Sequence, residues 1–124
     1  MTTVITEGRR TAEFLISEAN GHRSRDQGVV AQHSQTFTSG TVLGRVTVTA
    51  KLTRLSPGAS NGTQTAAAVL YADVDATGGD RRAVVIARDA EVNGKLLSWP
   101  DGISSGDKTT AIAALAATGI IVRA

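Results

Sequence analysis

The runs Ala66-Ala-Ala-Val-Leu-Tyr-Ala72 and Ala83-Val-Val-Ile-Ala-Arg88 decide the fold class of this 124-residue chain. Both are short apolar segments of the kind that forms strands, and the first is apolar throughout, which predicts burial on both of its faces. Thr77-Gly-Gly-Asp80 stands between them. It is a turn signal, because glycine adopts the backbone angles that tight turns require. The two runs are therefore predicted to form a β-hairpin.

A further strand is predicted upstream of this hairpin, from Thr41 to Thr53. Apolar residues alternate there with Thr, Arg and Lys, a period of two that is typical of a strand with one buried face. The strand is expected to end at Ser56-Pro-Gly-Ala-Ser-Asn-Gly62, where proline lacks an amide donor and the glycines favour a turn. Asn93-Gly94 marks a later reversal of the chain.

One short helix is predicted near the C-terminus. Asp107 is expected to cap its start, and Gly119 suits the position just after its end. Residues at helical spacing form its predicted apolar face: Ile112, Leu115 and Ala116. Ile120-Ile-Val122 follows as a last strand. Residues 38–124 are thus predicted to form a mainly β, barrel-like domain with one short C-terminal helix.

Residues 1–37 differ from the rest of the chain. The apolar cluster Phe14-Leu-Ile16 is followed by a polar stretch with no sustained period, and Val29-Val30 forms a second small apolar group. So few apolar residues cannot build a separate domain, yet a solvated coil would not need them. We therefore predict that residues 1–37 are an extended N-terminal arm that becomes ordered against a partner.

Composition excludes several functional classes. The chain has no cysteine, which excludes disulfides, thiolate nucleophiles and cysteine-based metal sites. Thirteen Lys and Arg against eleven Asp and Glu leave a formal net charge of +2, and aromatic residues make up 3% of the chain. This balance does not favour direct binding of nucleic acid. The longest apolar runs are too short to span a membrane, and no secretory signal is visible at the N-terminus.

The candidate metal and modification sites have simpler interpretations. Asp73-x-Asp75-x-Thr77-Gly78 resembles the start of a calcium loop, but Val84 stands where such a loop needs a bidentate glutamate. A turn with solvated acids is the preferred interpretation, and no metal is expected. His22 and His33 are interpreted as surface histidines. Asn61-Gly-Thr63 is interpreted as a turn rather than a glycosylation site.

No nucleophile elbow, phosphate loop or dinucleotide-binding fingerprint occurs, so neither catalysis nor a cofactor is expected. Arg9-Arg10 and Arg23-Ser-Arg25 are basic clusters that fit protein–protein contacts. Acidic residues of the same segment balance them: Glu7, Glu13, Glu18 and Asp26. Two alternatives stay open. One is a small β-barrel module that binds a glycan through Trp99, and the other is a hydrolase that uses Asp73, Asp75 and a histidine.

Four segments follow one another in a distinctive order: Gly40–Val46, Ala68–Asp80, Ala83–Val92 and Leu97-Ser-Trp-Pro100. The most specific of them is the last, in which Leu97, Trp99 and Pro100 precede an alanine-rich helix. From Thr38 to Val122 the chain resembles the lambda-type head decoration proteins of tailed phages, and these three residues are the marker of that family's fold.

This resemblance implies a homotrimer of small β-tulip domains on the outer surface of the expanded capsid. The trimers would occupy three-fold sites and stabilise the shell against internal DNA pressure, after synthesis in the host cytoplasm. The resemblance also implies that the N-terminal arm contacts the major capsid protein. The apolar residues of the arm are its expected anchors: Phe14, Leu15, Ile16, Val29 and Val30. No catalytic site and no cofactor are implied.

Overall fold

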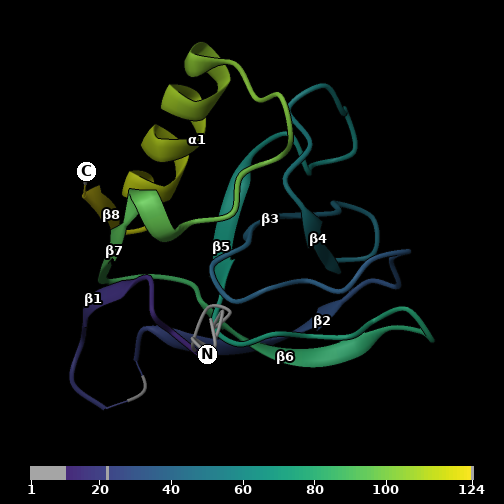
Figure 1. The fold of residues 1–124 in the computed structure, drawn as a ribbon, viewed down its shortest axis with the longest axis horizontal. Coiled ribbons are helices and arrows are strands. Elements are labelled where there is room, and N and C mark those ends of the chain that lie inside the picture. Colours follow the sequence, from purple (N-terminus) through teal and green to yellow (C-terminus); the bar gives the residue numbers. More distant parts are fainter. Residues whose placement is uncertain (1–10, 22, 124) are drawn as a thin grey trace, which may run out of the picture.

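Two β-sheets, one closed and one open, organise the chain (Figure 1). The computed structural model describes residues 11–21 and 23–123. The closed barrel has the strand order β2 (Arg25–Val30), β4 (Leu52–Arg54), β3 (Val42–Arg45), β5 (Ala66–Leu70) and β6 (Arg81–Ile86). The open sheet has the order β1 (Leu15–Glu18), β7 (Ala90–Asn93) and β8 (Ile120–Arg123). The helical elements are the 3-10 helix η1 (Gly94–Leu96) and the α-helix α1 (Ser105–Ala117).

These elements confirm a mainly β fold with a barrel and one short C-terminal helix. β5 and β6 form the predicted hairpin, in which Val69 pairs with Ile86. β6 also pairs along its whole length with β2, in antiparallel orientation. The barrel closes where Val30 of β2 pairs in parallel with Leu52 of β4. Closure leaves no barrel strand with an unpaired edge.

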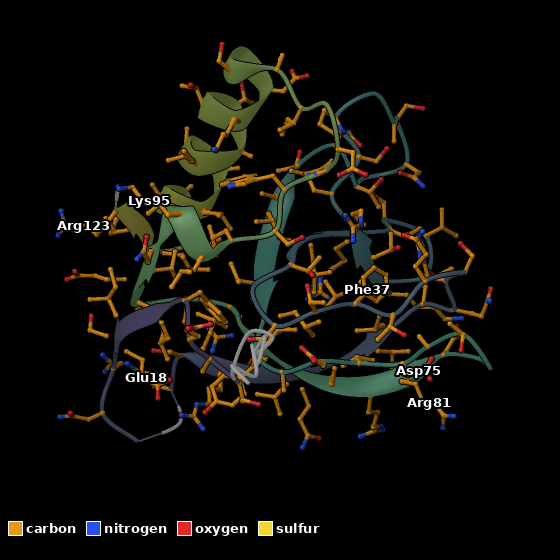
Figure 2. All side chains as sticks on the ribbon, viewed as in Figure 1. Glu18, Phe37, Asp75, Arg81, Lys95 and Arg123 are labelled. Carbon is orange, nitrogen blue, oxygen red and sulfur yellow. The ribbon has the colours of Figure 1, made fainter. Side chains whose placement is uncertain are left out.

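Two apolar cores form because side chains alternate across each strand. The barrel core contains residues from all five barrel strands and from the loops beside them: Val30, Phe37, Leu43, Leu52, Ala68, Leu70, Ala76, Ala83 and Val85. The helix-side core joins α1 and the open sheet to the outer faces of the barrel strands: Phe14, Val42, Leu55, Ala66, Val69, Ile86, Ala90, Val92, Leu97, Ala111, Leu115 and Ile120. β5 contributes to both cores, which confirms its predicted burial on both faces. Phe37 lies among the barrel strands in Figure 2.

The single strand predicted from Thr41 to Thr53 is wrong, because two strands, β3 and β4, occupy this stretch. The chain reverses between them, where the Val46 amide donates to the Lys51 carbonyl at 2.8 Å. Ala50 has a φ of 59°, and Val48 at the turn is 92% exposed. Apolar and polar residues keep alternating through this reversal, which contains no glycine, proline or asparagine. The pattern therefore carried no sign of the turn.

Residues 11–37 do not form an extended arm, which corrects the predicted boundary at residue 37. β1 pairs with β7, and β2 is a barrel strand. Phe14 belongs to the helix-side core and is 1% exposed. The prediction failed here because β7, which pairs with β1, and β6, which pairs along the whole of β2, lie more than fifty residues away in the chain, so no local period indicates the pairing. Residues 1–10, the first part of the predicted arm, lie outside the described residues.

The helix begins earlier than predicted. Its N-cap is Ser104, whose Oγ accepts a hydrogen bond from the Asp107 amide at 3.1 Å, so Asp107 lies in the first turn and is not the cap. Serine and aspartate cap helices about equally well, and the sequence alone did not separate them. Ala111 and Leu115 are the buried residues of α1, whereas Ala116, expected on the apolar face, is exposed.

The C-terminal strand follows the helix as predicted. Gly119, just after α1, has a φ of 89°, the left-handed conformation that commonly ends a helix. β8 then pairs in parallel with β7, and α1 packs beside β8 and β5 (Figure 1). Among the described residues, no helix is both long enough and apolar enough to cross a membrane.

Candidate functional site

The residues predicted to anchor the chain to a capsid do not share one exposed surface. Phe14 and Val30 are buried, with 1% and 0% of their surface exposed, one in each core. Leu15 and Val29 are half-buried. Ile16 is 53% exposed. Of these five residues, Ile16 is the one most accessible to a partner.

Ile16 is exposed because of an irregularity in the pairing of β1. Leu15 pairs with Val92 and Ser17 pairs with Glu91, and the register shifts between these two pairs. Ile16 is therefore the extra residue of a bulge. β1 also lies at an edge of the open sheet, so its outer side has no strand partner among the described residues. A strand edge that carries an exposed apolar side chain is a surface on which another chain can add a strand.

Two buried serines hold the N-terminal segment against the domain. Ser39 Oγ accepts a hydrogen bond from the Ala12 amide at 3.1 Å and donates one to the Tyr71 carbonyl at 2.9 Å. Ser24 Oγ donates to the Asp89 carbonyl at 2.8 Å. Both side chains are almost completely buried, where a hydroxyl needs its partners. Sequence reasoning missed them, since no local pattern separates a buried serine from a surface one.

The charged residues of this segment pair both within it and beyond it. The Arg25 guanidinium donates two hydrogen bonds to the Glu18 carboxylate, at 3.1 and 2.6 Å. This contact raises the pKa of Arg25 above its ordinary value. The Arg25 guanidinium also lies 4.4 Å from the centre of the Tyr71 ring. Asp26, expected to balance a neighbouring arginine, pairs with Arg88 instead. Glu18 stands at the end of β1, far from Asp75 on the opposite side of Figure 2.

The acidic loop after β5 does not gather metal ligands. Asp73 Oδ1 accepts a hydrogen bond from the Ser39 amide at 2.7 Å. Asp75 Oδ1 accepts bonds from the amide and hydroxyl of Thr77 at 3.0 and 2.6 Å, which lower the pKa of Asp75. Within residues 11–21 and 23–123, no group of three or more acidic or histidine side chains is placed to hold a metal ion. These two aspartates support turns.

The glycosylation-like sequence is also a turn, as predicted. Asn61 Oδ1 accepts hydrogen bonds from the amide and hydroxyl of Thr63 at 3.2 and 2.6 Å. His33, expected on the surface, is half-buried, with its ring 4.9 Å from the ring of Phe37. Four residues of the sequence analysis lie outside the described part of the chain: Glu7, Arg9, Arg10 and His22.

The Leu97-x-Trp99-Pro100 element is part of the folded domain. Leu97 is buried, and Trp99 packs against the helix-side core. Lys108 Nζ lies 5.2 Å from the centre of the Trp99 ring, a cation–π contact. The depression beside Pro100, about 560 Å³, has no Trp, Tyr or Phe among its lining residues. Trp99 therefore does not present an open platform for a sugar, and the glycan-binding alternative gains no support.

Comparison with protein families covers nearly the whole chain. The model of the family described as bacteriophage lambda head decoration protein D matches residues 4–120. The chain belongs to this family. As a head decoration protein it is a structural component of the phage capsid, and its family is a structural one rather than a family of enzymes. No curated protein matches the chain.

The extent of the family match agrees with the fold. The match begins well before Thr38, where the resemblance noted in the sequence begins. It therefore includes β1 and β2, the strands that tie residues 11–37 into the domain. The decoration protein is thus a larger folded unit than residues 38–124.

Proposed function

We propose that this decoration protein is a homotrimer that binds three-fold sites on the outer surface of the expanded phage capsid. In that position it stabilises the shell against the pressure of the packaged DNA. The family match over residues 4–120 carries the proposal. A small domain with few large core side chains also gains stability when it associates with copies of itself, which favours an oligomer.

The proposed capsid contact lies in a shorter arm than residues 1–37. Residues 1–10 precede the described domain, and Thr2-Thr-Val-Ile-Thr6 consists of β-branched residues, which favour strands. Ten residues reach at most about 35 Å when extended. Such a segment adds a strand to a sheet edge of the major capsid protein, where main-chain hydrogen bonds supply the affinity. Ile16 belongs to the same contact, whereas the buried Phe14 and Val30 do not.

Three arms on one trimer bind the capsid more tightly than a single arm. Multivalent binding of this kind raises affinity by roughly 10²–10⁴ when the spacing of the binding sites matches the spacing of the arms. Expansion changes the spacing of sites on the shell. The trimer is therefore expected to bind expanded heads and to bind unexpanded heads weakly.

The decisive experiment compares the full chain with a variant that lacks residues 2–10. Co-sedimentation with expanded heads that lack the protein measures binding, and light scattering measures the oligomeric state. The variant is expected to remain a folded trimer and to lose at least about a hundredfold in affinity. Unchanged affinity would refute the arm contact. A full-length chain that is monomeric would refute the trimer.

A second comparison tests the exposed edge of β1. Ile16→Ser is expected to weaken capsid binding by about tenfold or more, because a buried isoleucine contributes about 1.5–3 kcal/mol. Val48→Ser is the matched control, since Val48 is 92% exposed in the turn between β3 and β4. If both substitutions have the same effect on binding, β1 is not part of the contact.

A further inference from the structure

Every asparagine of this chain is followed by glycine: Asn20-Gly21, Asn61-Gly62 and Asn93-Gly94. In such a pair, the backbone nitrogen of glycine attacks the carbonyl carbon of the asparagine side chain. A new C–N bond closes a five-membered succinimide, and the side-chain nitrogen leaves as ammonia. Water then opens the ring to aspartate or isoaspartate. Glycine favours this reaction because it has no side chain to obstruct the approach and its backbone rotates freely.

The fold prevents this reaction at Asn61. Asn61 Oδ1 accepts two hydrogen bonds from Thr63, which hold the side-chain amide in a turn. The Gly62 nitrogen, which would have to attack, donates a hydrogen bond to Gln64 Oε1 at 2.8 Å. Gly62 is also closely packed, because an added Cβ would lie 2.4 Å from the Arg45 carbonyl oxygen. Both reacting groups are therefore occupied and confined.

The fold also prevents it at Asn93. This residue ends β7, has a ψ of 111°, and its Oδ1 accepts a hydrogen bond from the Lys95 amide at 3.0 Å. Its own amide donates to the Phe14 carbonyl at 2.7 Å. Closing the succinimide requires ψ to rotate away from the extended conformation of a strand. That rotation would disturb the end of β7, where Asn93 bonds to Phe14 and pairs with Arg123 of β8.

Asn20 lies in the loop between β1 and β2 and has none of these restraints. Asn20 and Gly21 are both exposed, and a Cβ added to Gly21 would meet nothing within 4 Å. Among the described residues, none forms a hydrogen bond with the Asn20 side chain, and none accepts one from the Gly21 amide. We propose that Asn20 is a site of spontaneous deamidation in the folded protein, and that Asn61 and Asn93 are protected.

The chemical change at Asn20 is local but has a defined consequence. It adds one negative charge to a chain whose formal net charge is +2, and the isoaspartate product adds a methylene group to the backbone of the loop. The two ends of the loop are joined by a hydrogen bond, which the Ser24 hydroxyl accepts from the Ala19 amide at 2.9 Å. The modified chain is therefore expected to stay folded. The inference concerns this loop alone and does not depend on the proposed capsid role.

Ageing of the full chain at mildly alkaline pH tests the proposal. Peptide mapping by mass spectrometry follows conversion at each asparagine over time, in native buffer and in concentrated urea. In native buffer, Asn20 is expected to convert at least about tenfold faster than Asn61 or Asn93, because those two react only after local opening. In urea, the three sites are expected to convert at similar rates. Ion exchange in urea, which separates the chains, should resolve the aged native protein into two charge forms of the chain.

Asn20→Gln is the matched control, since glutamine keeps the amide but closes the ring far more slowly. This variant is expected to remain one charge form throughout the same ageing period. The proposal fails if Asn61 or Asn93 converts as fast as Asn20 in the native protein. It also fails if Asn20 stays unconverted in native buffer while it converts in urea.

Discussion

Replacing Phe14 by alanine tests whether the N-terminal segment is part of the domain. Phe14 is 1% exposed in the helix-side core, and its carbonyl oxygen accepts a hydrogen bond from the Asn93 amide at 2.7 Å. Removing a buried phenylalanine side chain costs about 3–5 kcal/mol. The total stability of a domain is about 5–15 kcal/mol, so Phe14→Ala removes a large part of it. The expected fall in Tm is roughly 10–20 °C.

Urea unfolding followed by circular dichroism measures this change. The titration is repeated at several protein concentrations, because self-association adds to the apparent stability of an oligomer. Ile16→Ala, two residues further along and 53% exposed, is the control and is expected to change the free energy of unfolding by less than about 1 kcal/mol. If Phe14→Ala costs no more than Ile16→Ala, residues 11–18 are not part of the core and the corrected domain boundary is mistaken.

Three further predictions concern packing, capping and pH. Gly44→Ala should lower the free energy of unfolding by more than about 1 kcal/mol, because an added Cβ would lie 2.6 Å from the backbone of Thr63. Gly58→Ala is the control: an added Cβ there meets nothing within 4 Å, so this variant should change stability little in the same urea titration. Ser104→Ala should cost about 1 kcal/mol through loss of the helix cap, measured by thermal unfolding. A hydrogen bond from the Lys51 side chain, and a weaker effect of one from the Gln32 amide, lower the pKa of Asp80 in the folded state. The ionised form of Asp80 therefore stabilises the fold at pH values above its unfolded pKa of about 3.9. This contribution is lost as the pH falls through the lower pKa of the folded state. Asp80→Asn should therefore weaken the acid dependence of unfolding below about pH 4, and an unchanged acid titration would contradict this role.

The capsid-contact role of the N-terminal apolar cluster stays a prediction, and the exposure of its residues could be predicted only in part. The sequence pointed to the N-terminal apolar cluster as a contact surface, and Ile16 of that cluster is exposed on an edge strand. It could not separate Ile16 from Phe14, two residues earlier, because both are large apolar side chains in one short cluster. Only the pairing of β1 with β7, and the bulge within it, sends the two side chains to different environments.

Local chemistry determined much of this protein. Apolar runs around a glycine turn determined the β5–β6 hairpin, and an alanine-rich segment before Gly119 determined the helix, because each depends on residues close together in the chain. The absence of cysteine and the near-balance of charge likewise follow from composition alone.

Only the tertiary structure decided which polar or irregular segments are strands, because the partners of those strands lie elsewhere in the chain. β2 is a strand because it pairs with β6 on one side and meets β4 on the other, although its first half, Arg25-Asp-Gln-Gly28, is polar and ends in glycine. The reversal between β3 and β4 likewise shows itself only in the antiparallel pairing of these strands, because residues 46–51 contain no turn motif. A strand with no apolar period of its own is stabilised by hydrogen bonds and burial that other segments supply, and those become visible only when the chain is folded.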